Sequence, residues 1–247
     1  MQANKDKIKQ LLYTGEAVNV ELAMQLADSQ SIDLSTLLDN IRYFYINGSR
    51  GSLRKANLED VVAVEDMIAD IHAYRYVSFG SNFKEEHYEA LLLLKKLSEI
   101  YFYYPSFDFF PKELFELKEL WRLVAVDGEL KTVNTEVTQL EHLRILRLTN
   151  NKIKTIPDNI GDLISLQELY LNNNNLVELP KSIGRLENLK TLFLGANQLQ
   201  TLPKELLELK SLAKFSVYGN PLDKSKVPKC LLEGDSIVAQ QLRKIIL

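Results

Sequence analysis

Apolar residues recur along the second half of the chain at intervals of 23 residues. Three clear copies, at residues 143–151, 166–174 and 189–197, place leucines at their first, fourth and sixth positions and end on asparagine. The same apolar grid continues into a copy that starts at residue 212, and it extends back to copies that start at residues 120 and 97. Because side chains of an extended strand alternate between its two faces, each copy predicts a short strand with one buried face.

Each copy continues with a second apolar segment that begins near a proline in most repeats, at Pro111, Pro157, Pro180 and Pro203. Proline restricts the backbone at these positions. The second segment is therefore expected to return the chain on the side opposite the strand. No single copy can bury its own apolar face, so six copies predict a stack of units with a continuous core.

Residues 97–222 resemble leucine-rich repeats of the 23-residue intracellular type, which occur in Ras-group scaffold proteins and many bacterial proteins; the run Leu-Pro-Lys-Ser-Ile-Gly-Arg-Leu at 179–186 is the best match. The resemblance implies an α/β fold, a right-handed horseshoe-shaped solenoid with a parallel concave sheet. The second repeat departs from the pattern in two places. Gly128 stands where asparagine is expected, and Ala125 fills less of the core than the expected leucine would.

The asparagine that ends each strand segment is expected to be structural. A buried amide can bond backbone groups that are left unpaired where the chain turns out of the strand. The predicted asparagine ladder consists of Asn151, Asn174, Asn197 and Asn220.

The regions that flank the repeats predict three further parts. Residues 1–82 show helical spacing of apolar residues and are predicted to form an all-α N-terminal domain. Residues 83–96 are predicted to form an N-terminal capping helix that covers the first strand, and residues 223–247 to form a C-terminal cap with a short helix. A solenoid needs such caps, because its terminal units would otherwise expose core and sheet edge.

The charge and the cysteine content bear on nucleic-acid binding and on the cellular location. The net charge is −3, and residues 97–247 carry 19 basic against 19 acidic residues, so the basic excess of a nucleic-acid binder is missing. A single cysteine, Cys230, excludes an internal disulfide and favours a reducing compartment. The first residues hold no apolar run of signal-peptide length, and no stretch approaches the ~20 apolar residues of a membrane span. These features predict a cytoplasmic protein.

The exposed strand positions predict a binding face. Aromatic residues and arginine, which are enriched in interface hot spots, gather at these positions. The alternative is that the same stripe reflects only cross-strand packing within the sheet. The residues predicted to bind a partner are Tyr101, Arg122, Ile145, Arg147, Tyr170, Asn172 and Phe193.

No residue pattern predicts a catalytic or metal site. His72, His87 and His142 have no metal-ligand spacing, and neither a cofactor nor a catalytic constellation is indicated. The chain is therefore predicted to be a non-enzymatic protein-interaction module or scaffold, a monomer or weak homodimer, that binds a protein or peptide. Three alternatives stay open: an exported bacterial effector or surface protein that binds a host protein, an enzyme with its site in residues 1–82, and a binding element formed by the N-terminal helices.

Overall fold

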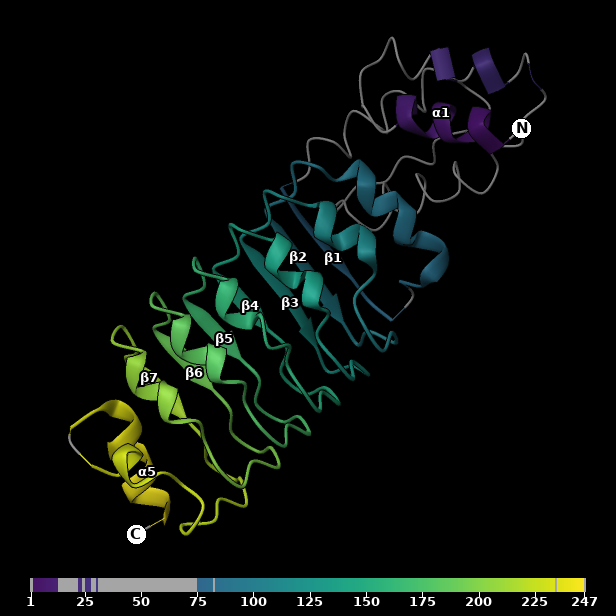
Figure 1. Ribbon diagram of the computed structural model, residues 1–247. Helices are drawn as coiled ribbons and strands as arrows, with labels where there is room; N and C mark the ends of the chain where they lie inside the picture. Colours follow the sequence, from purple (N-terminus) through teal and green to yellow (C-terminus); the bar gives the residue numbers. More distant parts are fainter. Residues whose placement is uncertain are drawn as a thin grey trace.

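The computed structural model describes residues 2–12, 22–23, 25–27, 30, 75–81, 83–233 and 235–246. Figure 1 shows an elongated stack in which strands line one side and helical turns line the other. The strands among the described residues form one parallel sheet in chain order. They are β1 Tyr76–Phe79, β2 Glu99–Tyr103, β3 Arg122–Val126, β4 Ile145–Arg147, β5 Glu168–Tyr170, β6 Thr191–Phe193 and β7 Lys214–Ser216. The predicted α/β solenoid with a parallel sheet is confirmed.

The side opposite the sheet carries one short 3₁₀-helix per unit. Four of these helices have proline as the N-cap residue, at Pro111, Pro180, Pro203 and Pro228. A unit of 23 residues leaves room for only a turn or two before the chain returns to the next strand. The 3₁₀-helices are η1 Glu85–Leu93, η2 Lys112–Glu116, η3 Thr135–Gln139, η4 Ile160–Asp162, η5 Lys181–Arg185, η6 Lys204–Glu208 and η7 Lys229–Leu231.

The register of the sheet advances by one 23-residue period at every strand. Glu99 pairs with Arg122, Arg122 with Ile145, and Ile145 with Glu168. The neighbouring column contains Tyr170, which pairs with Phe193 on the next strand. The columns expected from the repeat grid are thus the columns of the sheet.

The sheet begins one unit earlier than the six predicted repeats. Residues 1–82 were predicted to be helical, but β1 lies within this range and pairs with β2 through Tyr76 and Glu99. Val77 and Phe79 of β1 are buried, as the alternation of a strand requires. The predicted capping helix at 83–96 is η1, which occupies the helical half of this additional unit. The helices predicted within residues 31–74 lie outside the described residues.

The core changes in composition along the stack. Leucines at the inward strand positions, such as Leu146, Leu169 and Leu192, fill the central units and are at most 1% exposed. Aromatic side chains fill the first units instead, where the ring of Phe102 lies 5.2 Å from that of Phe83 and 5.3 Å from that of Phe107. Bulky aromatic rings therefore replace the smaller leucines of the regular repeat in these units.

Helices lie at both ends of the stack in Figure 1. At the N-terminal end, α1 Gln2–Leu12 contributes Ile8 and Leu12 to the same buried cluster as the repeats. At the C-terminal end, α5 Ile237–Ile246 packs against β7 and buries Val238 and Leu242.

The ladder asparagines hydrogen-bond backbone groups of two successive units. The side-chain amide of Asn174 donates to the carbonyl oxygens of Leu148 at 2.8 Å and Leu171 at 3.0 Å. Its Oδ1 accepts from the backbone N–H of Ile153 at 3.0 Å. Each of these amides therefore links its own unit to the unit before it. Equivalent bonds are made by Asn151, Asn197 and Asn220.

The structure explains the departure of the second repeat from the asparagine pattern. Pro105 occupies the ladder position of the preceding unit, and a Cβ added at Gly128 would lie 2.3 Å from Pro105 Cγ and 2.7 Å from its carbonyl oxygen. Real Cβ atoms do not approach that closely, so only glycine fits beside this proline. Pro105 and Gly128, which stand at two ladder positions in place of asparagine, therefore depend on each other's shape.

A second column of residues turns the chain after each strand with positive φ. Tyr104, Asp127, Asn150, Asn173 and Ala196 have φ between 53° and 60°. The side-chain amide of Asn173 donates to Asn150 Oδ1 at 2.7 Å, and that of Asn150 donates to Asp127 Oδ1 at 2.6 Å. This exposed row stops at Ala196, whose side chain has no amide to continue it.

We expect Ala196→Asn to raise the free energy of unfolding by about 1 kcal/mol, because asparagine tolerates the left-handed backbone region and its amide could donate to Asn173 Oδ1. The measurement is urea unfolding followed by circular dichroism. Ala196→Val is the matched control and should destabilise, since a β-branched residue is strained at this φ. An Ala196→Asn variant no more stable than wild type would contradict the interpretation.

Candidate protein-binding face

The outward side chains of β1 to β7 form the surface that we call the concave face. Strand alternation buries the middle residue of each three-residue strand and turns its two neighbours toward this face. On β4, for example, Leu146 is buried while Ile145 is half-buried and Arg147 is exposed. Consecutive strands therefore present two columns of side chains in register.

A continuous row crosses the centre of this face, with one residue from each of three strands. The guanidinium of Arg147 lies over the ring of Tyr170, 5.4 Å from its centroid. The ring of Tyr170 meets that of Phe193 edge to face, with 5.3 Å between centroids. Both contacts have favourable geometry for cation–π and aromatic pairs. We call Arg147, Tyr170 and Phe193 the central row.

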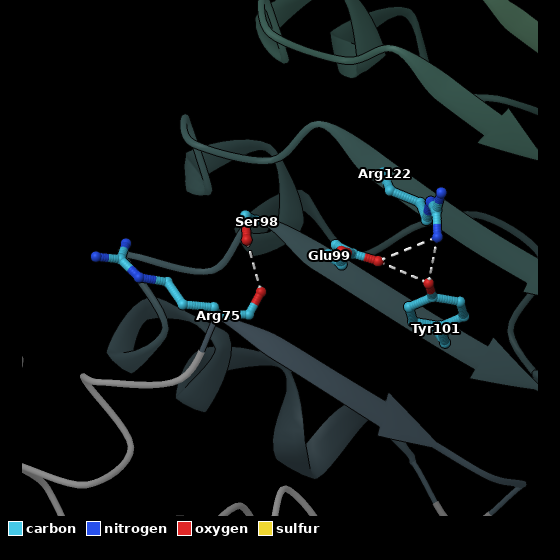
Figure 2. A network of polar contacts seen from close by, with 5 residues as sticks. All are labelled: Arg75, Ser98, Glu99, Tyr101 and Arg122. Atoms are coloured by element: carbon cyan, nitrogen blue, oxygen red, sulfur yellow. Dashed lines mark hydrogen bonds and ion pairs between the residues drawn. The ribbon is translucent and has the colours of Figure 1, made fainter.

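A second group lies at the N-terminal end of the face. Figure 2 shows Glu99 and Tyr101 of β2 converging with Arg122 of β3. The Tyr101 hydroxyl donates to Glu99 Oε2 at 2.7 Å, and Arg122 Nη1 donates to the Tyr101 oxygen at 2.9 Å and to Glu99 Oε2 at 3.3 Å. The charges of Glu99 and Arg122 therefore largely neutralise each other.

Figure 2 also shows a structural bond beside this network, in which the Ser98 hydroxyl donates to the carbonyl oxygen of Arg75 at 2.8 Å. The Arg75 side chain points away from Arg122 in this view and donates to the carbonyl oxygen of Lys96 at 2.9 Å. Arg75 thus holds the first two units together and is not part of the Arg122 network.

The surroundings shift three pKa values on the face. Partial burial and the hydrogen bond to Glu168 raise the pKa of Tyr170, whose hydroxyl donates to Glu168 Oε2 at 2.8 Å. Burial likewise raises the pKa of Tyr101. Burial opposes the charge of Arg122, but the bond to Tyr101 and the field of Glu99 outweigh it and raise the Arg122 pKa. Both tyrosines are therefore neutral donors at physiological pH.

A hollow of about 490 Å³ opens at the edge of the face where β3 to β5 begin. Its lining includes Trp121, Arg144, Ile145 and Glu168. The guanidinium of Arg122 lies over the Trp121 ring, 4.6 Å from its centroid. The hollow thus lies along the edge of the sheet where these strands begin, with Trp121 and Arg144 immediately before β3 and β4.

The structure divides the seven predicted residues into separate places. The sequence placed Ile145, Tyr170 and Phe193 close together with Arg122 and Arg147 nearby. The structure instead brings Arg147, Tyr170 and Phe193 into contact and places Tyr101 and Arg122 in the N-terminal network. Ile145 lines the hollow and pairs in register with Glu168. Asn172 is half-buried at the end of the face, where its Oδ1 accepts from the Thr149 hydroxyl at 3.3 Å.

Three positions in the predicted solvent-facing columns are buried, namely Val124, Thr149 and Thr191. Val124 is only 7% exposed, and its register neighbours Tyr101 and Arg147 carry long side chains that shield it. The hydrogen bonds that Tyr101 and Tyr170 each form with the glutamate two residues earlier were also not predicted from the sequence. That pairing has a sequence signal, because Glu99 and Tyr101, like Glu168 and Tyr170, are two residues apart on one face of a strand.

No group of three or more histidine, cysteine, aspartate or glutamate residues within the described residues could hold a metal ion. No helix in the described part of the chain is both long and apolar enough to cross a membrane.

Comparison with known proteins agrees with the fold. Residues 114–233 match a family described as leucine-rich repeat region. No curated protein sequence matches the chain. The match covers just under half of the chain, from η2 through the regular repeats to the segment before α5.

Two solved structures illustrate the likeness. A leucine-rich repeat protein of Leptospira interrogans is 43% identical, with a TM-score of 0.53, over 56% of this chain and 35% of its own. TLR13, whose structure was solved as a TLR13–ssRNA13 complex, is 22% identical, with a TM-score of 0.52, over 60% of this chain and 22% of its own. The second likeness shows the fold alone, and the chain spans about a third of the Leptospira protein.

Proposed function

We propose that the chain is a protein-interaction module or scaffold that binds a protein or peptide partner on its concave face. The observation that carries the proposal is the central row, in which Arg147, Tyr170 and Phe193 follow one another across three strands. An arginine and two aromatic rings in one contiguous row are typical of interface hot spots. The repeat fold supports the same role, because solenoids present extended surfaces to their partners.

The proposed role is binding without catalysis. The two carboxylates in the outer strand column, Glu99 and Glu168, each accept a tyrosine hydroxyl and are held in fixed hydrogen bonds. These pairs support a rigid recognition surface.

We further propose a cytoplasmic location, which the single thiol of Cys230 supports, and a bacterial origin, which the 43% identity to the Leptospira protein supports. Export to act on a host protein is the alternative, and it would use the same concave face. A secretion assay on the native organism separates the two locations.

The test of the proposed function is affinity capture from native-cell lysate with wild type and the double variant Arg147→Glu/Tyr170→Ala. Truncation of a hot-spot residue typically costs about 2 kcal/mol or more of binding free energy. The double variant should therefore bind the captured partner at least ~100-fold more weakly than wild type does. Isothermal titration with the purified partner gives the affinity. Thermal unfolding should be nearly unchanged, since Arg147 is exposed and Tyr170 is half-buried.

The matched control is Lys204→Glu/Leu207→Ala, which makes the same kinds of change on the helical side of the stack, where both residues are exposed. It should bind as wild type does. Equal binding by a folded Arg147→Glu/Tyr170→Ala variant would refute recognition by the concave face.

A further inference from the structure

Positive charge without a partner collects on one part of the concave face. At the outward strand positions from β4 to β7 the exposed cations are Arg147 and Lys214, and two further exposed cations, Arg144 and Lys190, immediately precede β4 and β6; within the described residues none of the four forms an ion pair. The acid of the same strand columns over this stretch is Glu168, which accepts a hydroxyl from Tyr170. This part of the face is basic although the chain as a whole carries −3.

The N-terminal part of the face differs in this respect. There Arg122 lies 3.3 Å from Glu99, so its charge is already compensated within the protein. A ligand that carries negative charge is therefore attracted toward β4 to β7 more than toward β2 and β3. The two ends of the face therefore differ in charge: the cation at the N-terminal end is compensated, and the cations near β4 to β7 are not.

Arg147 is prepared to bind a carboxylate. Its guanidinium is held over the Tyr170 ring, 5.4 Å from the centroid, and the side chain is exposed. Stacking restrains the planar group and leaves its N–H edge for a two-point bond to a carboxylate. Less conformational entropy is then lost when an acidic ligand binds.

The central row also sets a spacing. Arg147 and Phe193 lie in one register column, separated by the strand that carries Tyr170. Neighbouring strands are about 4.8 Å apart, so the two residues are separated by roughly 10 Å along the sheet. A peptide in the extended polyproline II conformation rises about 3.1 Å per residue with three residues per turn, so its side chains three residues apart lie on one face about 9 Å from each other.

We propose that the concave face between β4 and β7 binds an extended acidic peptide segment. One carboxylate of the segment meets Arg147, and an apolar side chain three residues away packs against Phe193. Lys190 and Lys214 attract further acidic residues of the segment. This inference rests on the proposed function and adds the chemistry of the partner.

A peptide fits this surface better than a nucleic acid. Glu168 lies among the cations and would repel a continuous phosphate backbone, while it can accept an N–H from a peptide main chain. Phosphate binders also need several cations in one track, and here apolar Ile145 and Phe193 interrupt them. Carboxylates spaced along a peptide can avoid Glu168, whereas a regular phosphate chain cannot.

The test begins with short random peptides displayed on phage and selected on the immobilised full chain at about 50 mM salt, where electrostatic attraction is weakly screened. We expect enrichment of aspartate or glutamate three residues from a leucine or aromatic residue. The enriched peptide is then synthesised with a fluorophore, and its affinity is measured by anisotropy. Arg147→Glu should weaken binding by at least ~30-fold, and 0.5 M salt should weaken it further.

Lys204→Glu is the charge-matched control and should bind the peptide as wild type does. Selected peptides that are neutral or basic but still require Tyr170 would overturn the acidic-peptide inference and leave the proposed function standing. Peptides that bind Arg147→Glu and Tyr170→Ala as well as wild type would overturn both. A failed selection, or a single-stranded oligouridine that binds more tightly than the peptide, would overturn the inference.

Discussion

Asn174→Ala is expected to lower the free energy of unfolding by about 3 kcal/mol, because it removes several hydrogen bonds between the side-chain amide and buried backbone groups. The side chain is 5% exposed. Its removal leaves the N–H of Ile153 and the carbonyl oxygens of Leu148 and Leu171 without their amide partner. A buried donor without an acceptor costs about 1–3 kcal/mol alone. The measurement is urea unfolding of wild type and variant.

Asn175→Ala is the control for this prediction, since Asn175 is the next residue and its side chain is exposed. It should change the free energy of unfolding by less than about 0.5 kcal/mol. Equal stability of the Asn174→Ala and Asn175→Ala variants would show that the ladder amides contribute little.

The second large effect is expected at Gly161, where alanine should destabilise the protein by about 2 kcal/mol. A Cβ at this position would lie 2.2 Å from the carbonyl oxygen of Ser182 and 2.9 Å from Arg185 Nε. The backbone of η5 would have to move away from η4, which separates two units that share a core. The gain from a less flexible unfolded chain is smaller than this loss.

Gly195→Ala is the comparison variant, because its new Cβ would lie 3.1 Å from the Tyr218 carbonyl oxygen and requires only a small adjustment. We expect a loss below about 1 kcal/mol for it by urea unfolding. If Gly161→Ala were as stable as wild type, close approach of successive 3₁₀-helices would not be the reason for glycine at this position.

The periodic part of the structure could be predicted because each unit repeats the same physical requirement. Leu146, Leu169 and Leu192 fill equivalent core positions, and the amides of Asn151 and Asn174 satisfy equivalent backbone groups. Repetition makes such a pattern visible in one sequence. The register of the concave face followed from the same grid.

The irregular units were harder to predict, because their packing depends on pairs of unusual residues. Val77 and Phe79 continue the 23-residue grid. Aromatic residues replace the leucines there, so the unit that contains β1 does not match the leucine pattern. Gly128 is explained only by its contact with Pro105 in the preceding unit. These features depend on three-dimensional contacts between units and not on the residue type at one position.

The candidate site was predicted as a set of exposed positions and not as a set of interactions. The sequence placed Arg147, Tyr170 and Phe193 in one column, and the structure brings them into contact. It did not show that Arg122 is neutralised by Glu99, since that depends on side-chain conformation. The difference between the two ends of the face therefore emerged only from the structure.

Photo-crosslinking from the concave face tests the proposed function most directly. Benzoylphenylalanine is placed at position 170 in one variant and at position 207, on the helical side, in another. Both are irradiated in native-cell lysate. Recognition by the concave face predicts a specific adduct from position 170 that disappears when Arg147→Glu is added, and no such adduct from position 207. A specific adduct from position 207 alone would contradict it.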